Sequence, residues 1–353
     1  MIDFDAFKAK YQHAPVKEYP NRVCEVMPEP VVSVHVSTYQ HADFIQDCLD
    51  GVLMQETDFP FEIIIGEDES DDGTREICKE YADQHPDQIR LFLHRRENNI
   101  AIHGRPTGRF QFTYSHFMAR GKYIAICEGD DYWTDPLKLQ KQVDFLEANP
   151  EFVASHHDAK IVNEAGQQIE SSKLSDDRKR DWSRGDLQRG SLMLTVSVCC
   201  RNAIEDYPVR YFEVLNGDIF LFSLLGEYGR AKYQSEIQPA AYRKHKGGMW
   251  SERDEKYTTY HYGNTMLKLG EYHTYVCNDD IADHYLGRAL WCYGYLQLLS
   301  YRKGQICEFL RASSSYIHLC LRNKKIRLAI GNARESVKRL VVLLLNGLKP
   351  QGS

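Results

Sequence analysis

The chain has 353 residues, of which 42% are hydrophobic and 12% aromatic, ample for one large core and a smaller one. Its formal net charge of −6 excludes a basic nucleic-acid-binding protein as the general class. The ten cysteines include no CxxC pair, no apolar signal segment opens the chain, and no apolar run approaches the ~20 residues of a membrane span. We therefore expect reduced thiols in a cytoplasmic protein without a transmembrane helix.

Buried strands and amphipathic helices alternate in the first half of the chain. Residues 1–29 are polar and interrupted by prolines, and we expect them to form an N-terminal lead-in. Four apolar, β-rich runs then alternate with four segments of helical spacing. The runs cover residues 31–36, 61–67, 89–94 and 122–128, and the helical segments cover residues 41–55, 71–85, 113–121 and 134–150. This alternation predicts an α/β fold with a mostly parallel sheet sandwiched by helices.

The rhythm changes after residue 150. Residues 151–162 and 194–200 read as strands, whereas the strongly polar stretch 165–190 is typical of a mobile surface loop. Residues 215–229 predict a helix whose first turn holds Asp218. From residue 256 the pattern is mainly helical, which predicts a helical C-terminal extension.

Two acidic clusters directly follow predicted strands. The first is GEDESDD at residues 66–72, and the second is EGDD at residues 128–131. The carboxyl ends of parallel strands share one edge of a sheet, where ligands bind. Packed carboxylates repel one another and favour a bound cation, although a solvated turn is the simpler alternative for either cluster taken alone.

Four segments together resemble glycosyltransferase family 2, which has the GT-A fold. They are SVHVSTYQHADFI, EIIIGEDESDDGT, GKYIAICEGDDYW and YRKHKGGMWS, in the family's order. Gln40, Glu67 and Glu128 replace an Asn and two Asp residues of the family pattern. The resemblance implies a GT-A domain at residues 30–255, with a mixed, mostly parallel sheet, followed by the helical region 256–353.

The resemblance also implies a nucleotide-sugar site at the acidic edge. Asp68 would accept a hydrogen bond from a base ring N–H, Tyr39 would stack on the base, and Glu128 would bind the ribose. Residues implied in nucleotide-sugar binding are Thr38, Tyr39, Glu67, Asp68, Glu128, Gly129 and Asp130. Asp130, Asp131 and His245 would hold Mn²⁺ or Mg²⁺, which suits hard ligands and bridges diphosphate oxygens.

Glycosyl transfer also needs a base for the acceptor hydroxyl. Asp218 matches the carboxylate that performs a single inverting displacement in this family, although Gly217 stands where the family commonly has Glu. A helix-capping role is the alternative for Asp218, and a plain surface position is the alternative for His245. Arg105 or Arg109 could face phosphate, or lie solvated on the surface.

Two other classes of function compete with a glycosyltransferase. A sugar nucleotidyltransferase would show a Gly-rich, basic loop after the first strand, and STYQHADF has none. A non-catalytic nucleotide-sugar-binding module of the same fold is the second rival. The presence of Asp130, Asp131 and Asp218 argues against it.

The C-terminal segment combines an apolar stripe with positive charge. Eight basic residues and one acidic residue lie between Leu321 and Lys349. Apolar residues recur at helical spacing at Ile326, Ile330, Ala333, Val337, Leu340, Val341, Leu344 and Leu348. This pattern predicts an interfacial helix on anionic lipid, at the inner face of the plasma membrane. Packing on the protein itself, or in a homo-oligomer, is the alternative.

The resemblance and this tail together suggest the partners of the chain. The donor would be a nucleotide sugar, most simply a UDP-sugar, and no nucleic acid is expected. The acceptor would be a glycan or lipid-linked glycan in bacterial surface polysaccharide synthesis.

Overall fold

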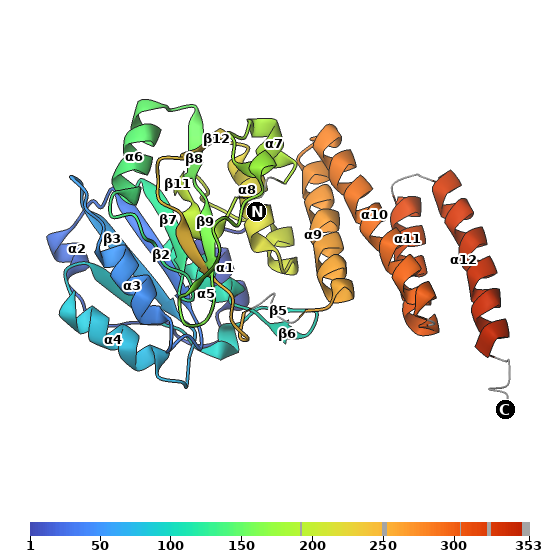
Figure 1. Ribbon diagram of the computed structural model, residues 1–353, viewed down its shortest axis with the longest axis horizontal. Helices are drawn as coiled ribbons and strands as arrows, with labels where there is room; N and C mark the ends of the chain where they lie inside the picture. Colours follow the sequence, from blue (N-terminus) through green and yellow to red (C-terminus); the bar gives the residue numbers. More distant parts are fainter. Residues whose placement is uncertain (191–192, 249–252, 304, 323–325, 348–353) are drawn as a thin grey trace. The chain divides into compact units, whose positions relative to one another are not determined.

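A computed structural model describes residues 1–190, 193–248, 253–303, 305–322 and 326–347. The chain divides into two compact units (Figure 1). The first unit comprises residues 1–212 and 217–251, and the second comprises residues 213–216 and 252–353.

The first unit is built on a mixed sheet that has eight strands within the described residues. In spatial order these are β1 (Lys17–Glu18), β4 (Ile89–Leu93), β3 (Phe61–Glu67), β2 (Val32–Thr38), β7 (Tyr123–Glu128), β11 (Cys199–Arg201), β8 (Phe152–His156) and β12 (Arg230–Tyr233). β4, β3, β2 and β7 run parallel, and these are the four strands predicted from the sequence. β11 runs antiparallel between β7 and β8.

The register of the central strands aligns their carboxyl ends. Thr38 of β2 lies opposite Glu67 of β3, and Ser37 lies opposite Glu128 of β7. The segments that follow these strands therefore start at one edge of the sheet. This arrangement confirms the predicted α/β class with a mostly parallel sheet.

Helices cover both faces of this sheet (Figure 1). The helices of the first unit are α1 (Phe4–Tyr11), α2 (Val23–Val26), α3 (Ile45–Leu53), α4 (Thr74–Gln84), α5 (Arg109–Phe117), α6 (Lys138–Ala148), α7 (Arg184–Gln188) and α8 (Gly217–Leu225). Alternate residues of the strands, such as Val34, Ile63 and Ala125, form one buried core with α3, α4 and α6. α5 packs on the other face, so close that a Cβ on Gly66 of β3 would overlap the Gln111 side chain.

Two small sheets complete the first unit. One orders β10 (Gln168–Glu170), β9 (Ala159–Val162) and β13 (Ala240–Arg243), and the other pairs β5 (Ala101–Ile102) with β6 (Arg105–Pro106). The predicted strand at 151–162 is thus two strands, β8 and β9, which belong to different sheets. The predicted strand at 194–200 is a 3₁₀ turn, Thr195–Ser197, followed by β11.

Residues 165–190, expected to form a mobile surface loop rather than core, contain regular secondary structure and buried side chains. This stretch contains β10 and α7, and α7 begins with a capping box formed by Ser183 and Asp186. Trp182 is buried and exchanges backbone hydrogen bonds with Ala231 of β12. Buried apolar side chains at intervals hold the stretch on the unit despite its charged composition.

Residues 1–29, expected as a polar lead-in, take part in the first unit. Phe7 of α1 is fully buried and stacks on Phe110 of α5 at 5.0 Å between ring centroids. β1 adds an antiparallel edge strand beside β4. The buried aromatic side chains of this segment therefore attach it to the first unit despite its prolines and charges.

The second unit is helical, as predicted for the C-terminal extension. Its helices are α9 (Glu255–Tyr275), α10 (Asp279–Arg302), α11 (Ile306–Arg322) and α12 (Ile326–Gly347). The Gln297 side-chain amide of α10 binds Ser313 of α11 at 2.7 Å and Asn332 of α12 at 2.9 Å. Among the described helices, none combines the length and the apolar content that crossing a bilayer requires.

Candidate functional site

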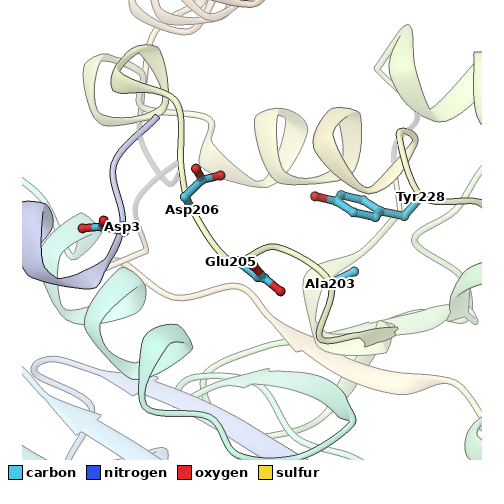
Figure 2. A pocket seen from close by; sticks show the side chains of 5 residues that line it. All are labelled: Asp3, Ala203, Glu205, Asp206 and Tyr228. Carbon is cyan, nitrogen blue, oxygen red and sulfur yellow. The ribbon is translucent and has the colours of Figure 1, made fainter.

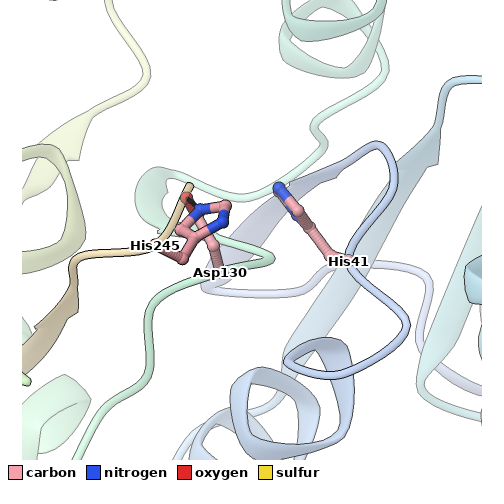
Figure 3. Close-up of side chains that lie close together, drawn as sticks. All are labelled: His41, Asp130 and His245. Atoms are coloured by element: carbon pink, nitrogen blue, oxygen red, sulfur yellow. Dashed lines mark hydrogen bonds and ion pairs between the residues drawn. The ribbon is translucent and has the colours of Figure 1, made fainter. Parts of the chain in front are cut away.

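Three side chains with metal-binding atoms converge at the edge of the sheet where β2 and β7 end. His41 follows β2, Asp130 lies in the turn after β7, and His245 follows β13. One ligand atom from each side chain lies within 4.8 Å of the other two. His245 Nε2 donates a hydrogen bond to Asp130 Oδ2 at 3.0 Å. Figure 3 shows that the three side chains project toward one another from separate loops.

β13 brings His245 to this edge from a distant part of the sequence. Tyr132 and Ala241 exchange backbone hydrogen bonds of 3.1 and 2.8 Å. Arg243 Nε donates to the Asp130 carbonyl oxygen at 3.0 Å. The turn after β7 is therefore fixed to β13, and His245 follows two residues beyond Arg243.

His41 is oriented by its own loop. Its Nδ1 lies 3.2 Å from Thr38 Oγ1, at the end of β2. A Cβ on Gly129 would lie 2.7 Å from that hydroxyl and 2.9 Å from the ring nitrogen. Glycine at position 129 thus lets the turn after β7 approach His41, which gives this predicted site residue a structural reason.

The residues at this edge fit a divalent cation. A carboxylate and two imidazoles are ordinary ligands of divalent transition metals, and their ligand atoms converge without any rearrangement of the loops. Burial raises the pKa of Asp130, but the hydrogen bond from His245 and the neighbouring imidazoles outweigh burial, so the pKa lies below its ordinary value. Burial lowers the pKa of His41, although Asp130 opposes it. An ionised carboxylate beside a neutral imidazole is the state that binds metal.

Asp131, predicted as a second carboxylate ligand, lies outside this converging group. Its side chain is buried, and its Oδ1 accepts a 2.8 Å hydrogen bond from the backbone N–H of Arg243. Burial raises its pKa well above the ordinary value, and the charges of Asp130 and Glu128 act in the same direction. In this structure Asp131 therefore links the turn after β7 to β13 through this hydrogen bond.

Two further carboxyl groups lie beside the cluster. Glu128 Oε2 is buried and has no hydrogen-bond partner among the described residues. Burial raises the pKa of Glu128 to about 7, and the charges of Asp130 and Asp218 add to this effect. Burial also raises the pKa of Asp218, while the Ile219 backbone and the Arg109 charge lower it. A carboxyl with a raised pKa is suited to accepting a proton near neutral pH.

Arg109 occupies the space beside the backbone of Gly217, next to Asp218. A Cβ on residue 217 would overlap the Arg109 guanidinium. Arg109 Nη1 donates to the Tyr211 hydroxyl at 2.9 Å, and the guanidinium lies 4.5 Å from the centre of that ring. The glycine that departs from the family pattern therefore makes room for a cation beside the predicted base.

A second group of polar residues lies at the ends of β3 and β4. Arg96 Nη1 and Asn99 Nδ2 donate to Asp68 Oδ2 at 3.0 and 2.9 Å. The Arg96 guanidinium also lies 3.8 Å from the centre of the Tyr39 ring. Asp68 Oδ1 is buried and has no hydrogen-bond partner among the described residues. Burial raises the pKa of Asp68 to about 6, although Asn99 and Arg96 oppose it.

Glu67 is fully buried and serves its own loop. Its carboxylate forms an ion pair with Arg75 of α4 and accepts a 2.7 Å hydrogen bond from the backbone N–H of Ser70. These contacts hold the loop after β3 and leave the neighbouring Asp68 as the group with an open acceptor oxygen.

Several residues at this edge were not predicted from the sequence, namely His41, Arg96, Asn99 and Arg243. Arg96 and Asn99 follow β4, so the rule that located the acidic clusters also applies to them. His41 stands three residues beyond the end of β2, within reach of the same edge. Arg243 gives no comparable signal, because its role depends on the pairing of β13.

Other polar features of the first unit lie apart from these groups. Arg105 belongs to the β5–β6 hairpin and is exposed. A hollow of about 500 Å³ is lined by Asp3, Ala203, Glu205, Asp206 and Tyr228 (Figure 2). It shares no residue with the groups around Asp130 and Asp68.

Comparisons with known proteins agree on one family. Residues 33–201 match the family model described as glycosyl transferase family 2. The protein Rv1520 of Mycobacterium tuberculosis is 36% identical over 222 residues, which cover 62% of this chain and 60% of the relative. The chain thus spans about 60% of that relative's length. The putative teichuronic acid biosynthesis glycosyltransferase TuaG of Bacillus subtilis is 33% identical over 118 residues, or 33% of this chain and 42% of TuaG.

A solved structure shares the fold. Residues 1–349 of S. aureus TarS, crystallised in complex with UDP-GlcNAc, superpose with a TM-score of 0.60. The match has 16% sequence identity and covers 88% of this chain and 90% of that chain. At this identity the likeness establishes the GT-A fold.

Proposed function

The chain belongs to glycosyltransferase family 2 through residues 33–201, and we propose that it transfers a sugar from a nucleoside-diphosphate donor to a glycan acceptor. The observation that carries the proposal is the convergence of Asp130, His41 and His245 beside the half-buried carboxyl groups of Glu128 and Asp218, whose pKa values are raised. A diphosphate, its counter-cation and a general base would meet at such a place.

Donor binding would use both groups at the sheet edge. The buried Asp68 Oδ1 lacks a donor, and a base ring N–H such as that of uracil would satisfy it. Tyr39 is 38% exposed on one side of Arg96, so its ring is available for stacking. Asp130 and His245 would hold Mn²⁺ or Mg²⁺, which neutralises the charge that develops on a departing diphosphate. We therefore expect the donor to be a UDP-sugar.

Asp218 would act on the acceptor. Its carboxylate takes the proton of the acceptor hydroxyl while that oxygen attacks the anomeric carbon and the bond to the diphosphate breaks. One displacement inverts the anomeric configuration. The Arg109 charge beside Asp218 keeps part of the carboxyl population ionised despite burial. Glu128 would accept hydrogen bonds from the donor's ribose.

A donor screen tests this proposal. The full chain is incubated with Mn²⁺ and a panel of UDP-, GDP- and dTDP-sugars, and release of free nucleoside diphosphate is measured. We expect slow hydrolysis of one donor class without acceptor and faster release with a glycan acceptor. Formation of pyrophosphate from a sugar phosphate and a nucleoside triphosphate would point to a nucleotidyltransferase instead. Tight UDP binding with no turnover of any donor would support a binding module.

We also propose that α12 brings the enzyme to anionic lipid at the inner face of the plasma membrane, where a lipid-linked glycan of surface polysaccharide synthesis would be the acceptor. Val337 and Val341 of the predicted stripe are 61 and 49% exposed, although a helix that packed its whole apolar stripe would bury them. The adjacent Val342 is 42% exposed. Arg334 and Lys338 lie on the same outward face and are exposed. Apolar and basic side chains on one exposed face suit an anionic membrane surface.

Part of this helix packs within its own unit. Ser336 is buried and lies 3.2 Å from the Gln297 amide of α10, so the inward face is polar and the outward face partly apolar. The side chains of Ile326, Ile330, Leu344 and Leu348, which belong to the predicted stripe, lie outside the described residues.

A further inference from the structure

We infer that His41 is a direct ligand of the divalent cation, and that the site prefers Mn²⁺ or another transition metal to Mg²⁺. The inference rests on the proposed function in one respect, since the cation would be the one that accompanies the donor diphosphate. It goes further in assigning a ligand on the β2–α3 loop and a metal preference that follows from that ligand.

The geometry brings an imidazole from this loop to the carboxylate. His41, Asp130 and His245 place one ligand atom each within 4.8 Å of the others (Figure 3). The two imidazole rings stand nearly perpendicular, with centroids 5.9 Å apart. The hydrogen bond between His245 and Asp130 accounts for two of the three residues. It gives no reason for a third, half-buried imidazole at the same point.

The environment of His41 orients it as metal ligands are oriented in proteins. The Nδ1 atom faces the Thr38 hydroxyl at 3.2 Å, which leaves Nε2 for a ligand. A metal-bound histidine almost always has such a partner on its second ring nitrogen.

Glycines lie directly beside the two imidazoles of the His41–Asp130–His245 group. A side chain on Gly129 would lie 2.9 Å from His41 Nδ1, and one on Gly247 would lie 3.2 Å from His245 Nδ1. Both positions therefore favour residues without a Cβ, and both border the same three side chains. Phe44 packs edge-on against His245 at 4.8 Å between ring centroids, which restricts the movement of that ring.

Ligand chemistry then sets the metal. Mg²⁺ binds oxygen ligands, keeps several waters and is rarely held by imidazole. Imidazole favours transition metals, and one carboxylate with two imidazoles is a donor set that Mn²⁺, Co²⁺ and Zn²⁺ all accept. Asp131 accepts a hydrogen bond from the Arg243 backbone, so the converging ligand atoms at this edge come from one carboxylate and two imidazoles.

Metal titration of the full chain without nucleotide tests the inference. Calorimetry or Mn²⁺ electron paramagnetic resonance should show Mn²⁺ binding at least about tenfold tighter than Mg²⁺. His41→Ala should weaken Mn²⁺ binding by more than about tenfold, because even outer partners of metal ligands contribute about 10–100-fold. Mg²⁺ affinity should change much less. His85→Ala, at the C-terminal end of α4, is the matched control and should leave both affinities unchanged.

A second variant keeps the test informative if removal of His41 disturbs the loop. His41→Asp replaces the imidazole with a carboxylate and should shift the preference toward Mg²⁺. The Co²⁺-loaded protein should also change its visible spectrum between wild type and His41→Asp. Unchanged Mn²⁺ affinity and an unchanged Co²⁺ spectrum in both variants would overturn the inference. Normal metal binding without turnover of any nucleotide sugar would instead contradict the proposed function alone.

Discussion

Arg109 and Gly217 depend on one another, because the Arg109 guanidinium fills the volume that any side chain on residue 217 would need. The two residues are separated by more than 100 positions in the sequence, yet together they set the charge beside Asp218. A carboxylate in place of this glycine would require the arginine to leave. The pair therefore gives a structural reason for glycine at the position where the resemblance implies Glu.

Gly217→Ala should displace Arg109 and lower turnover, while donor binding changes little. We expect a loss on the order of 10–100-fold in kcat, since small shifts of reacting groups have effects of this size. Steady-state kinetics and UDP calorimetry separate the two effects. If displacement of Arg109 causes the loss, Arg109→Ala should lower kcat to a similar extent, and the double variant should lose little more than either single variant. Losses that add in the double variant would argue against displacement as the cause.

Arg109→Gln should shift the acidic limb of the pH–rate profile to higher pH. The Arg109 charge lowers the pKa of Asp218, so its removal leaves burial less opposed and the carboxyl holds its proton to higher pH. The base is then ionised in a smaller fraction of molecules at a given acidic pH. Profiles of kcat for wild type and variant measure this shift, and coincident profiles would show that the two groups are not coupled.

Asp218→Asn should retain donor and metal binding but lose transfer. An amide of the same size cannot take the acceptor proton, and we expect turnover to fall by about a hundredfold or more. Calorimetry with UDP and Mn²⁺ provides the control. Near-normal turnover would leave Asp218 as a helix-capping residue of α8.

UDP binding should weaken as the pH falls through about 6, and Asp68→Asn should remove much of that dependence. The pKa of Asp68 is raised to about 6, so its carboxylate accepts a base N–H fully above that pH and progressively less below it. The diphosphate of UDP titrates equally with both proteins, which makes the difference between wild type and variant the measurement. Parallel affinity curves from pH 5 to 8 would exclude Asp68 as the base acceptor.

The same raised pKa has a defined sign for folding. The ordinary pKa of this carboxyl is 3.8, so between that value and about 6 the folded chain holds a proton that the unfolded chain has lost. Asp68 therefore favours the folded state at low pH, and this contribution disappears as the pH rises through about 6. Asp68→Asn should accordingly raise the melting temperature more at pH 7.5 than at pH 4.

Gly66→Ala should destabilise the first unit, whereas Gly287→Ala should not destabilise the second. A Cβ on Gly66 overlaps the Gln111 side chain of α5, and overpacking of this kind costs about 1–3 kcal/mol. Gly287 of α10 has open space around its Cα, and alanine in a helix is favoured by about 0.5–1 kcal/mol. Thermal unfolding of both variants compares the two, and equal destabilisation would contradict the packing of α5 on β3.

Charge on the outward face of α12 should release the protein from lipid. Val337→Glu with Val341→Glu in the full chain should abolish co-sedimentation with vesicles that contain anionic lipid. Leu310→Glu is the matched control, because Leu310 is 44% exposed on α11 and outside the basic face. Equal sedimentation of all three proteins would assign α12 to packing alone.

The α/β order and the position of the site were predictable, because both depend on local patterns. Short apolar, β-rich runs predicted β2, β3, β4 and β7, which are buried almost throughout, and their parallel pairing then places Asp68 and Asp130 at one edge. The distinction between Asp130 and Asp131 was not predictable. It depends on the Arg243 backbone, 112 residues further along the chain, which takes one of two adjacent carboxylates.

The structured stretch at 165–190 shows a similar limit. Its charges outnumber its apolar residues, yet buried Leu174, Trp182 and Leu187 hold it on the sheet. Periodicity could not reveal this, since these residues are too far apart to define a helix or a strand. Their partners, such as Ala231 of β12, come from elsewhere in the chain.

The side-chain amide of Gln297 restricts the register of the C-terminal helices. Its nitrogen lies within hydrogen-bond distance of Ser313, Asn332 and Ser336, and its oxygen accepts from Asn332 at 2.8 Å. A displacement of α12 along α10 would break the present hydrogen bonds of Gln297 to Asn332 and Ser336 and leave only the one to Ser313 of α11, at a cost of about 1–3 kcal/mol for each polar group left without a partner. Apolar contacts alone would tolerate several registers of α12 along α10. The hydrogen bonds of this one polar side chain favour a single register. The hydrogen bonds of Gln297 therefore help to determine that the valines of α12 face outward. A substitution at Gln297 would change which side chains of α12 are exposed.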